Sequence, residues 1–138
     1  MLVGPCYGGA VIMVAGAAAD NVVGLVSVAA FTPDEGESLA DILASYPDTQ
    51  LAAVRPAEFP LDDTGETGVE VYAAPKASPA AFAADLPSEV AAVAAVSQRL
   101  FAASGLEEKA GVVAWKTLPS WAVVVTADEM IQPDAPSQ

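Results

Sequence analysis

The sequence predicts an α/β fold with about three parallel strands, on the basis of three observations. Two apolar runs rich in β-branched residues, at 21–31 and 119–128, are typical of strands buried on both faces. A short strand followed by an apolar helix opens the chain, and helical patterns occupy part of the stretch between the two runs. Strands that alternate with helices in this way favour a parallel sheet.

The first element begins as a strand at Leu2 and Val3, turns through 4–9 and continues as a helix at about 9–18. Ala, Val, Ile and Met side chains surround this helix almost completely, so we expect it to be buried. It is too short to span a bilayer, and no Lys or Arg precedes it as in a signal peptide. We therefore interpret it as part of the core and expect no membrane partner.

The run from Asn21 to Phe31 is the second expected strand, and a short helix at about 39–45 follows it. Ser38 and Asp41 have the spacing of a capping box, in which each side chain accepts a hydrogen bond from the backbone N–H of the other residue. The pair predicts that this helix begins directly after Ser38.

The stretch at about 46–105 is expected to be a helical cap inserted between strands. Prolines and glycines interrupt 46–78, which predicts loop, and only the segment GVEVYAA resembles a strand. Ser78-Pro79 predicts the start of one helix, and a second helix is predicted after Pro87. The apolar positions of the second helix, which we expect to pack within the cap, are Val90, Val93, Ala94, Leu100 and Phe101.

The last strand is predicted to end on the carboxylate of Asp128. Trp115 and Trp121 flank this strand and are expected to pack rather than to bind a ligand. We find no internal repeat, so we predict one partial domain over 1–138.

The composition excludes several functions. The 18 acidic residues against five basic ones give a net charge of −13, which argues against nucleic acid or an anionic membrane as a partner. One cysteine permits no internal disulfide, so the cytoplasm is the simplest location. There is no histidine, which removes the usual base near neutral pH and any histidine-dependent metal site. We expect neither a metal nor a cofactor.

The segment VGPCYGG is the strongest candidate for chemistry. Its Gly4-x-Cys6-x-Gly8 spacing, between a strand and a helix, matches the nucleophile elbow G-x-S-x-G. An elbow holds the nucleophile on a strained turn, and the helix N-terminus is expected to lower the cysteine pKa. The backbone N–H of Tyr7 would then face a developing oxyanion. The alternative is that Cys6 is a buried, inert cysteine.

The segment LVGPCYGGAVI resembles the GHSYGG-type elbow of esterase-like α/β-hydrolases. The resemblance continues through nearly the whole chain, in VVGLVSVAAFTPDEGESL, AAFAADLP, SQR and AWKTLPSWAVVVTADEMIQPDA. It implies an incomplete α/β-hydrolase core, running from the elbow to the strand that precedes the acid, with an elbow helix and a cap. The family order of nucleophile, acid and histidine places the acid at Asp128.

The resemblance implies hydrolysis of a carboxylic ester or thioester, with Cys6 as nucleophile, Tyr7 as oxyanion donor and Asp128 as orienting acid. Two departures stand out: Cys6 replaces the family serine, and Pro5 replaces the histidine that commonly precedes it. The earlier strands and the triad histidine of the family pattern are also absent. We therefore expect weak or no activity from this chain alone.

Two readings follow. In the first, the chain is a hydrolase subunit that associates with itself or with a complementary chain, and a complementary chain supplies the histidine. In the second, it is a non-catalytic remnant or binding module. Asp128 could also be a carboxylate that only faces solvent or caps the next turn. Asp34 and Glu35 could reach the same end of the sheet, but they fit better as favourable charges at the following helix N-terminus.

Overall fold

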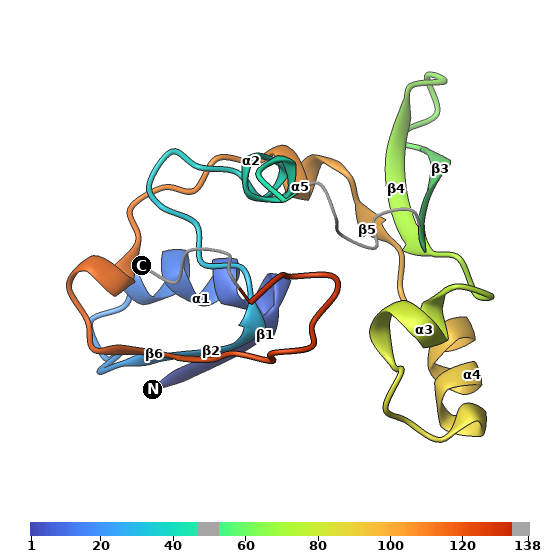
Figure 1. Ribbon diagram of the computed structural model, residues 1–138. Coiled ribbons are helices and arrows are strands. Elements are labelled where there is room, and N and C mark those ends of the chain that lie inside the picture. Colours follow the sequence, from blue (N-terminus) through green and yellow to red (C-terminus); the bar gives the residue numbers. More distant parts are fainter. Residues whose placement is uncertain (47–52, 134–138) are drawn as a thin grey trace. The chain divides into compact units, whose positions relative to one another are not determined.

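The computed structural model describes residues 1–46 and 53–133 (Figure 1). The chain forms two compact units, one from 1–47 and 107–138 and the other from 48–106. Within the described ranges, no helix is long and apolar enough to cross a membrane. Cys6, Tyr7 and Asp128 all belong to the first unit.

The first unit is built on a three-stranded sheet in the order β1-β2-β6, and both strand pairs are parallel. This confirms the predicted α/β fold. β2 begins four residues later than the predicted run and β6 ends five residues before Asp128, because flanking apolar residues extend each run beyond the paired segment. The elements of the unit are β1 (Leu2–Cys6), α1 (Tyr7–Ala17), β2 (Leu25–Ala30), α2 (Leu39–Ala44), η2 (Ala114–Lys116) and β6 (Ser120–Val123).

The core of this unit lies where α1 packs against the sheet and η2. Ile12 and Met13 of α1 contact the fully buried Leu25 of β2, together with Val113 and Ala114. The expectation of an all-round buried helix is wrong, because only one side of α1 faces these partners. Its outer side leaves Val11 and Val14 exposed.

α2 begins with the predicted capping box. Ser38 Oγ accepts from the Asp41 backbone N–H at 3.1 Å, and Asp41 Oδ2 accepts from the Ser38 backbone N–H at 2.9 Å. Lys109 forms an ion pair with Asp41 and, with the Ser38 hydrogen bonds, holds the pKa of that carboxyl well below its usual range. The start of α2 is thereby joined to the segment that returns to the sheet.

Within the described part of the first unit, no element covers the other side of the sheet, so the predicted burial on both faces is not found there. In Figure 1, α1 lies along one side of β1, β2 and β6, and no helix from the described part of this unit lies on the other. Trp121 is 55% exposed there, contrary to its predicted packing. Trp115 does pack against the core, and its indole N–H donates to the Pro33 carbonyl at 3.1 Å.

β1 has one partner, β2, among the described residues. The Leu2 N–H donates to the Gly24 carbonyl, and the Cys6 carbonyl accepts from the Phe31 N–H. Because successive residues of a strand direct their backbone groups to opposite edges, the backbone of Pro5 faces the open edge. Proline has no N–H to donate, which is tolerated at an edge.

The second unit contains an antiparallel sheet in the order β3-β4-β5, with the β3–β4 hairpin drawn in green in Figure 1. The predicted loop within 46–78 is thus wrong at β3, whereas the strand-like GVEVYAA falls largely in β4. Pro56 and Pro60 favoured a loop in the sequence analysis, but prolines are compatible with an edge strand such as β3. The elements are β3 (Val54–Pro60), β4 (Thr67–Ala73), α3 (Ser78–Phe82), α4 (Ser88–Ser97), β5 (Phe101–Ala102) and α5 (Ser104–Glu107).

α4 packs through small side chains. It buries Ala91 and Ala95 and exposes Val90, Val93 and Val96, so the predicted packing of its valines is wrong. The helix ends at Ser97, where the backbone of Gln98 becomes extended, so Leu100 and Phe101 lie beyond it. The Gln98 side chain binds the backbone of β4 at Ala73 through two hydrogen bonds of 2.7 and 2.8 Å. The small buried residues let α4 approach its neighbours closely.

Candidate active site

Cys6 lies at the last position of β1, and α1 begins at the next residue. Its backbone has φ 51° and ψ −125°, a conformation that a residue with a Cβ adopts at a cost of order 1–3 kcal/mol. The side chain is exposed rather than buried in packing. The chain thus reverses from strand to helix at a single strained residue and directs a thiol outward.

Gly4 and Gly9 permit this abrupt turn. A Cβ on Gly4 would lie 2.2 Å from the carbonyl oxygen of Gly8, and one on Gly9 would lie 2.4 Å from that of Phe31. These distances are too short for any non-bonded contact. The backbones of β1, α1 and the end of β2 therefore touch directly, which fixes where the helix begins.

The electrostatics around Cys6 oppose the thiolate. Loss of hydration raises the pKa of the Cys6 thiol, and the negative charge of Asp128 raises it further. A hydrogen bond from the Tyr7 backbone N–H lowers the pKa without reversing the balance. The helix N-terminus therefore lowers the pKa as predicted, but its contribution is outweighed and the net direction is upward.

Asp128 follows β6 by five residues, in a turn rather than on the strand. Its Oδ1 accepts hydrogen bonds from the backbone N–H groups of Met130 and Ile131, at 2.8 and 2.9 Å. The side chain is half-buried, and its charge is felt at the Cys6 sulfur. The turn after β6 thus holds a carboxylate in a fixed orientation at the same end of the sheet as Cys6.

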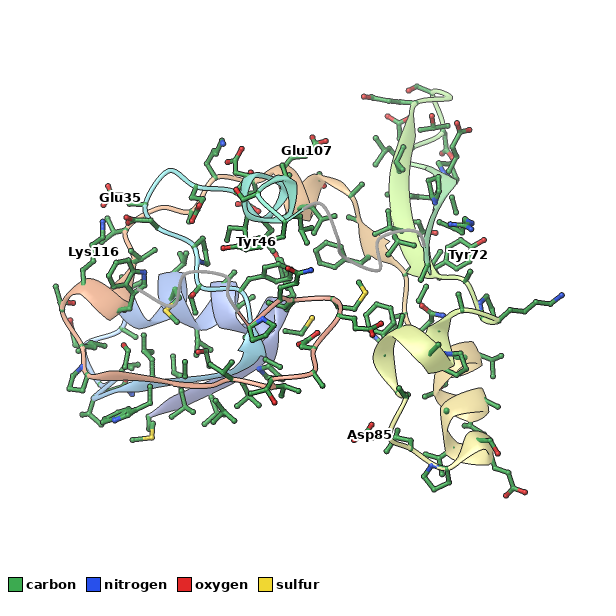
Figure 2. All side chains as sticks on the ribbon, viewed as in Figure 1. Glu35, Tyr46, Tyr72, Asp85, Glu107 and Lys116 are labelled. Atoms are coloured by element: carbon green, nitrogen blue, oxygen red, sulfur yellow. The ribbon has the colours of Figure 1, made fainter. Side chains whose placement is uncertain are left out.

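A cavity of about 110 Å³ opens beside Asp128, at the carboxyl ends of β2 and β6. Ala30, the register partner of Cys6, forms part of its wall, but Cys6 and Tyr7 themselves do not line the cavity. Tyr46, labelled in Figure 2, and Glu37 line it as well. Most of the wall is apolar: Ala29, Ala30, Phe31, Ile42, Ala122, Val123, Val124, Val125, Ile131 and Pro133.

Glu37 and Tyr46 were not among the residues predicted from the sequence. Both follow the second strand, and ligands of open parallel sheets bind beyond the carboxyl ends of the strands. That rule was the available signal. This rule selects the segment after β2 rather than individual side chains. The path of the chain after β2 decides which of its side chains line the cavity.

Asp34 and Glu35, the lesser candidates, take part in local contacts. Lys116, labelled in Figure 2, forms an ion pair with Asp34 and lowers the pKa of its carboxyl. Asp34 Oδ1 also accepts from the Glu35 backbone N–H at 2.6 Å. Neither residue lines the cavity. No group of three or more His, Cys, Asp or Glu side chains able to hold a metal ion occurs within 1–46 and 53–133.

The parallel sheet, the helix directly after β1 and the segment inserted before β6 have the arrangement of part of an α/β-hydrolase. A crystal structure of a mutant polyneuridine aldehyde esterase is similar, with a TM-score of 0.70 and 14% sequence identity over 96% of this chain and 55% of that one. The chain therefore spans about half the length of that esterase. No family model and no curated protein matches the chain. The resemblance to α/β-hydrolases is confirmed for the fold alone.

Proposed function

We propose that this chain is the nucleophile-bearing part of an acyl-transfer enzyme that acts on carboxylic esters or thioesters. Cys6 is the nucleophile, the Tyr7 backbone N–H is one oxyanion donor, and Asp128 orients a base that a complementary polypeptide supplies. The observation that carries the proposal is the exposed Cys6 at φ 51°, between a strand and a helix N-terminus. The site acts on a small substrate and needs no metal or cofactor for this chemistry.

The first half of the reaction lies within reach of these residues. The thiol gives its proton to solvent, and the sulfur attacks the carbonyl carbon. The oxygen of the carbonyl gains the negative charge that the Tyr7 N–H faces. The tetrahedral intermediate collapses by breaking the bond to the alcohol or thiol, which leaves as its anion, and an acyl thioester remains on Cys6.

The second half needs help from outside the chain. Release of the acyl group requires a water molecule activated by a general base, and the chain has no histidine. Asp128 already has two backbone partners and a fixed orientation, which supports a role in positioning a base rather than in accepting the proton itself. We therefore expect acylation without turnover.

The cavity beside Asp128 supports a small apolar acyl group. Its volume of about 110 Å³ has room for a small group. Phe31, Ile42 and Val124 line it with apolar surface. We therefore expect short acyl chains to fit this space better than long ones.

A second candidate function is binding without catalysis. The raised pKa of the Cys6 thiol favours it, since a neutral thiol is a poor nucleophile. In that case the cavity at the ends of β2 and β6 is the functional feature, and Cys6 is unreactive.

Single-turnover acylation separates the two functions. With p-nitrophenyl acetate in excess, we expect release of one equivalent of p-nitrophenol per chain, lost in Cys6→Ala. The rate is expected to rise with pH past about 8.5, the pKa of an ordinary cysteine, because the Cys6 pKa is raised. Equal rates in the unmodified chain and in Cys6→Ala would exclude the proposed acyl transfer by Cys6.

Asp128→Asn gives the sharper test, because asparagine keeps the oxygen acceptor and removes the charge. The negative charge raises the pKa of the Cys6 thiol, so its removal is expected to move the pH profile to lower pH. Acylation at pH 7.5 should therefore become faster in this chain alone. A matched Asp20→Asn variant, at a carboxylate that is neither in the cavity nor among the causes of the Cys6 shift, should leave the profile unchanged. A slower reaction in Asp128→Asn would contradict the proposed geometry.

A further inference from the structure

The cavity at the carboxyl ends of β2 and β6 is lined by negative charge. Among its described lining residues, the charged ones are Glu37, after β2, and Asp128, after β6. The rest of the described wall is apolar or carries hydroxyl or amide groups. A few polar groups in an apolar wall give a pocket its specificity. We therefore expect the cavity to distinguish ligands by their charge.

The basic residues of the first unit do not neutralise this charge. Its two lysines, Lys109 and Lys116, form ion pairs with other carboxylates, and neither lines the cavity. The sequence of 47–52 and 134–138 contains no Lys or Arg. Within the first unit, the cavity therefore has the same sign of charge as the whole chain, whose net charge is −13.

Glu37 is held in place by its neighbours. Its Oε2 accepts from the Asp34 backbone N–H at 2.9 Å, and its own backbone N–H donates to the Asp34 carbonyl at 3.0 Å. Its carbonyl accepts from the Ala110 N–H at 2.9 Å. Its Oε1 accepts no hydrogen bond from any residue that the structure describes. A fixed carboxylate with an oxygen still available is suited to bind an ammonium group, which has three N–H donors.

Two lining residues connect the cavity with the sulfur of Cys6. Asp128 lines the cavity, and its negative charge acts on the Cys6 thiol. Ala30 lines it as well and is the register partner of Cys6 in the sheet. We therefore expect the acyl group of a substrate that reacts at Cys6 to extend into the cavity.

We propose that Glu37 selects substrates whose short acyl chain ends in an ammonium group. The ammonium donates a charge-assisted hydrogen bond to Glu37, while the apolar wall contacts the methylene groups of the acyl chain. A substrate with a carboxylate on its acyl chain is repelled. The substrate class rests on the acyl transfer proposed for Cys6, whereas the preference of the cavity for a cation does not.

Three probes of similar size test the preference of the cavity without any reaction: butylammonium, 1-butanol and butanoate. In NMR titrations of the whole chain at constant ionic strength, we expect butylammonium to bind at least tenfold more tightly than 1-butanol. Butanoate is expected to bind more weakly than either. An affinity for butanoate or 1-butanol equal to that for butylammonium would overturn the proposal.

Matched glutamates locate the bound cation. Glu37→Gln keeps an oxygen acceptor for the Asp34 N–H and is expected to weaken butylammonium binding at least fivefold. Glu35→Gln is the control and should leave binding unchanged, because Glu35 does not line the cavity. Figure 2 shows Glu35 well apart from Tyr46, which does line it. Equal affinity of the two variants would mean that net charge alone attracts the cation and would overturn the proposal.

A matched pair of esters tests the substrate class. The acyl chains of p-nitrophenyl 3-aminopropanoate and p-nitrophenyl butanoate have the same length and end in an ammonium and a methyl group. We expect the ammonium ester to acylate Cys6 at least fivefold faster, relative to the same pair with 2-mercaptoethanol, and Glu37→Gln to lose this advantage. An equal ratio of rates in the unmodified chain and in Glu37→Gln would overturn the proposal. Selective binding of butylammonium by a chain that neither ester acylates would support the preference for a cation and overturn the proposed acyl transfer.

Discussion

The junction of β1 with α1 and the helix α4 are packed in opposite ways. At the junction, backbone touches backbone, and the position of a Cβ on Gly4 is already occupied by the carbonyl of Gly8. In α4, alanines face inward and the larger valines face solvent. The difference teaches that the junction requires glycine itself, whereas the buried side of α4 requires only a small side chain. Of these two regions, the candidate site lies in the one that tolerates less change.

The largest effect is expected from Gly4→Ala. The added methyl would lie 2.2 Å from a backbone oxygen that has no side-chain freedom to move away, so β1 and α1 must separate. We expect a loss of about 3 kcal/mol or more in the free energy of unfolding of the first unit. Urea denaturation followed by tryptophan fluorescence measures it, because both tryptophans belong to this unit.

Gly111→Ala is the control for that loss. A Cβ at Gly111 meets nothing within 4 Å, so little change is expected. Equal stability of the two alanine variants would remove the contrast between the junction and the rest of the chain.

An intermediate effect is expected when the buried side of α4 is enlarged. Ala91 is 2% exposed, and leucine there must displace its neighbours, at a cost of about 1–3 kcal/mol. Hydrogen exchange of the α4 amides, which reports on the second unit separately, is expected to become faster. If Ala91→Leu proved neutral, α4 would have room inside and the close approach of its small residues would be incidental.

The smallest effect is expected on the outer side of the same helix. Val93 is 65% exposed, so Val93→Ala removes little buried surface and introduces a better helix former. The change in unfolding free energy should stay within about 0.5 kcal/mol, with exchange of the α4 amides unchanged or slower. A loss above about 1 kcal/mol would show that Val93 is covered in solution.

Local patterns in the sequence predicted local structure well. Ser38 and Asp41 predicted a capping box, which both hydrogen bonds confirm. The turn from β1 into α1 also follows from nearby residues, because the glycines that permit it lie within one helical turn of Cys6. The capping box and the close approach of Gly4 to Gly8 depend on contacts between residues close in sequence, whereas the approach of Gly9 to Phe31 does not.

Features set by distant residues escaped prediction. The Cys6 pKa depends on the loss of hydration and on Asp128, which is far from Cys6 in the sequence, and together these outweigh the nearby N–H of Tyr7. Likewise, β3 is a strand despite Pro56, because its position at an edge makes the missing N–H harmless. An apolar run such as 21–31 predicted a strand but could not show which of its faces has a neighbour.

Pro5 has a consequence for the behaviour of the chain at high concentration. A strand from another molecule that docked along the free side of β1 would find no hydrogen to accept at Pro5, in a strand only five residues long. The hydrogen bonds between the docked strand and β1 would be interrupted at Pro5, so further molecules could not add in the same way. The protein is therefore protected against fibrillar growth from this side, immediately next to Cys6.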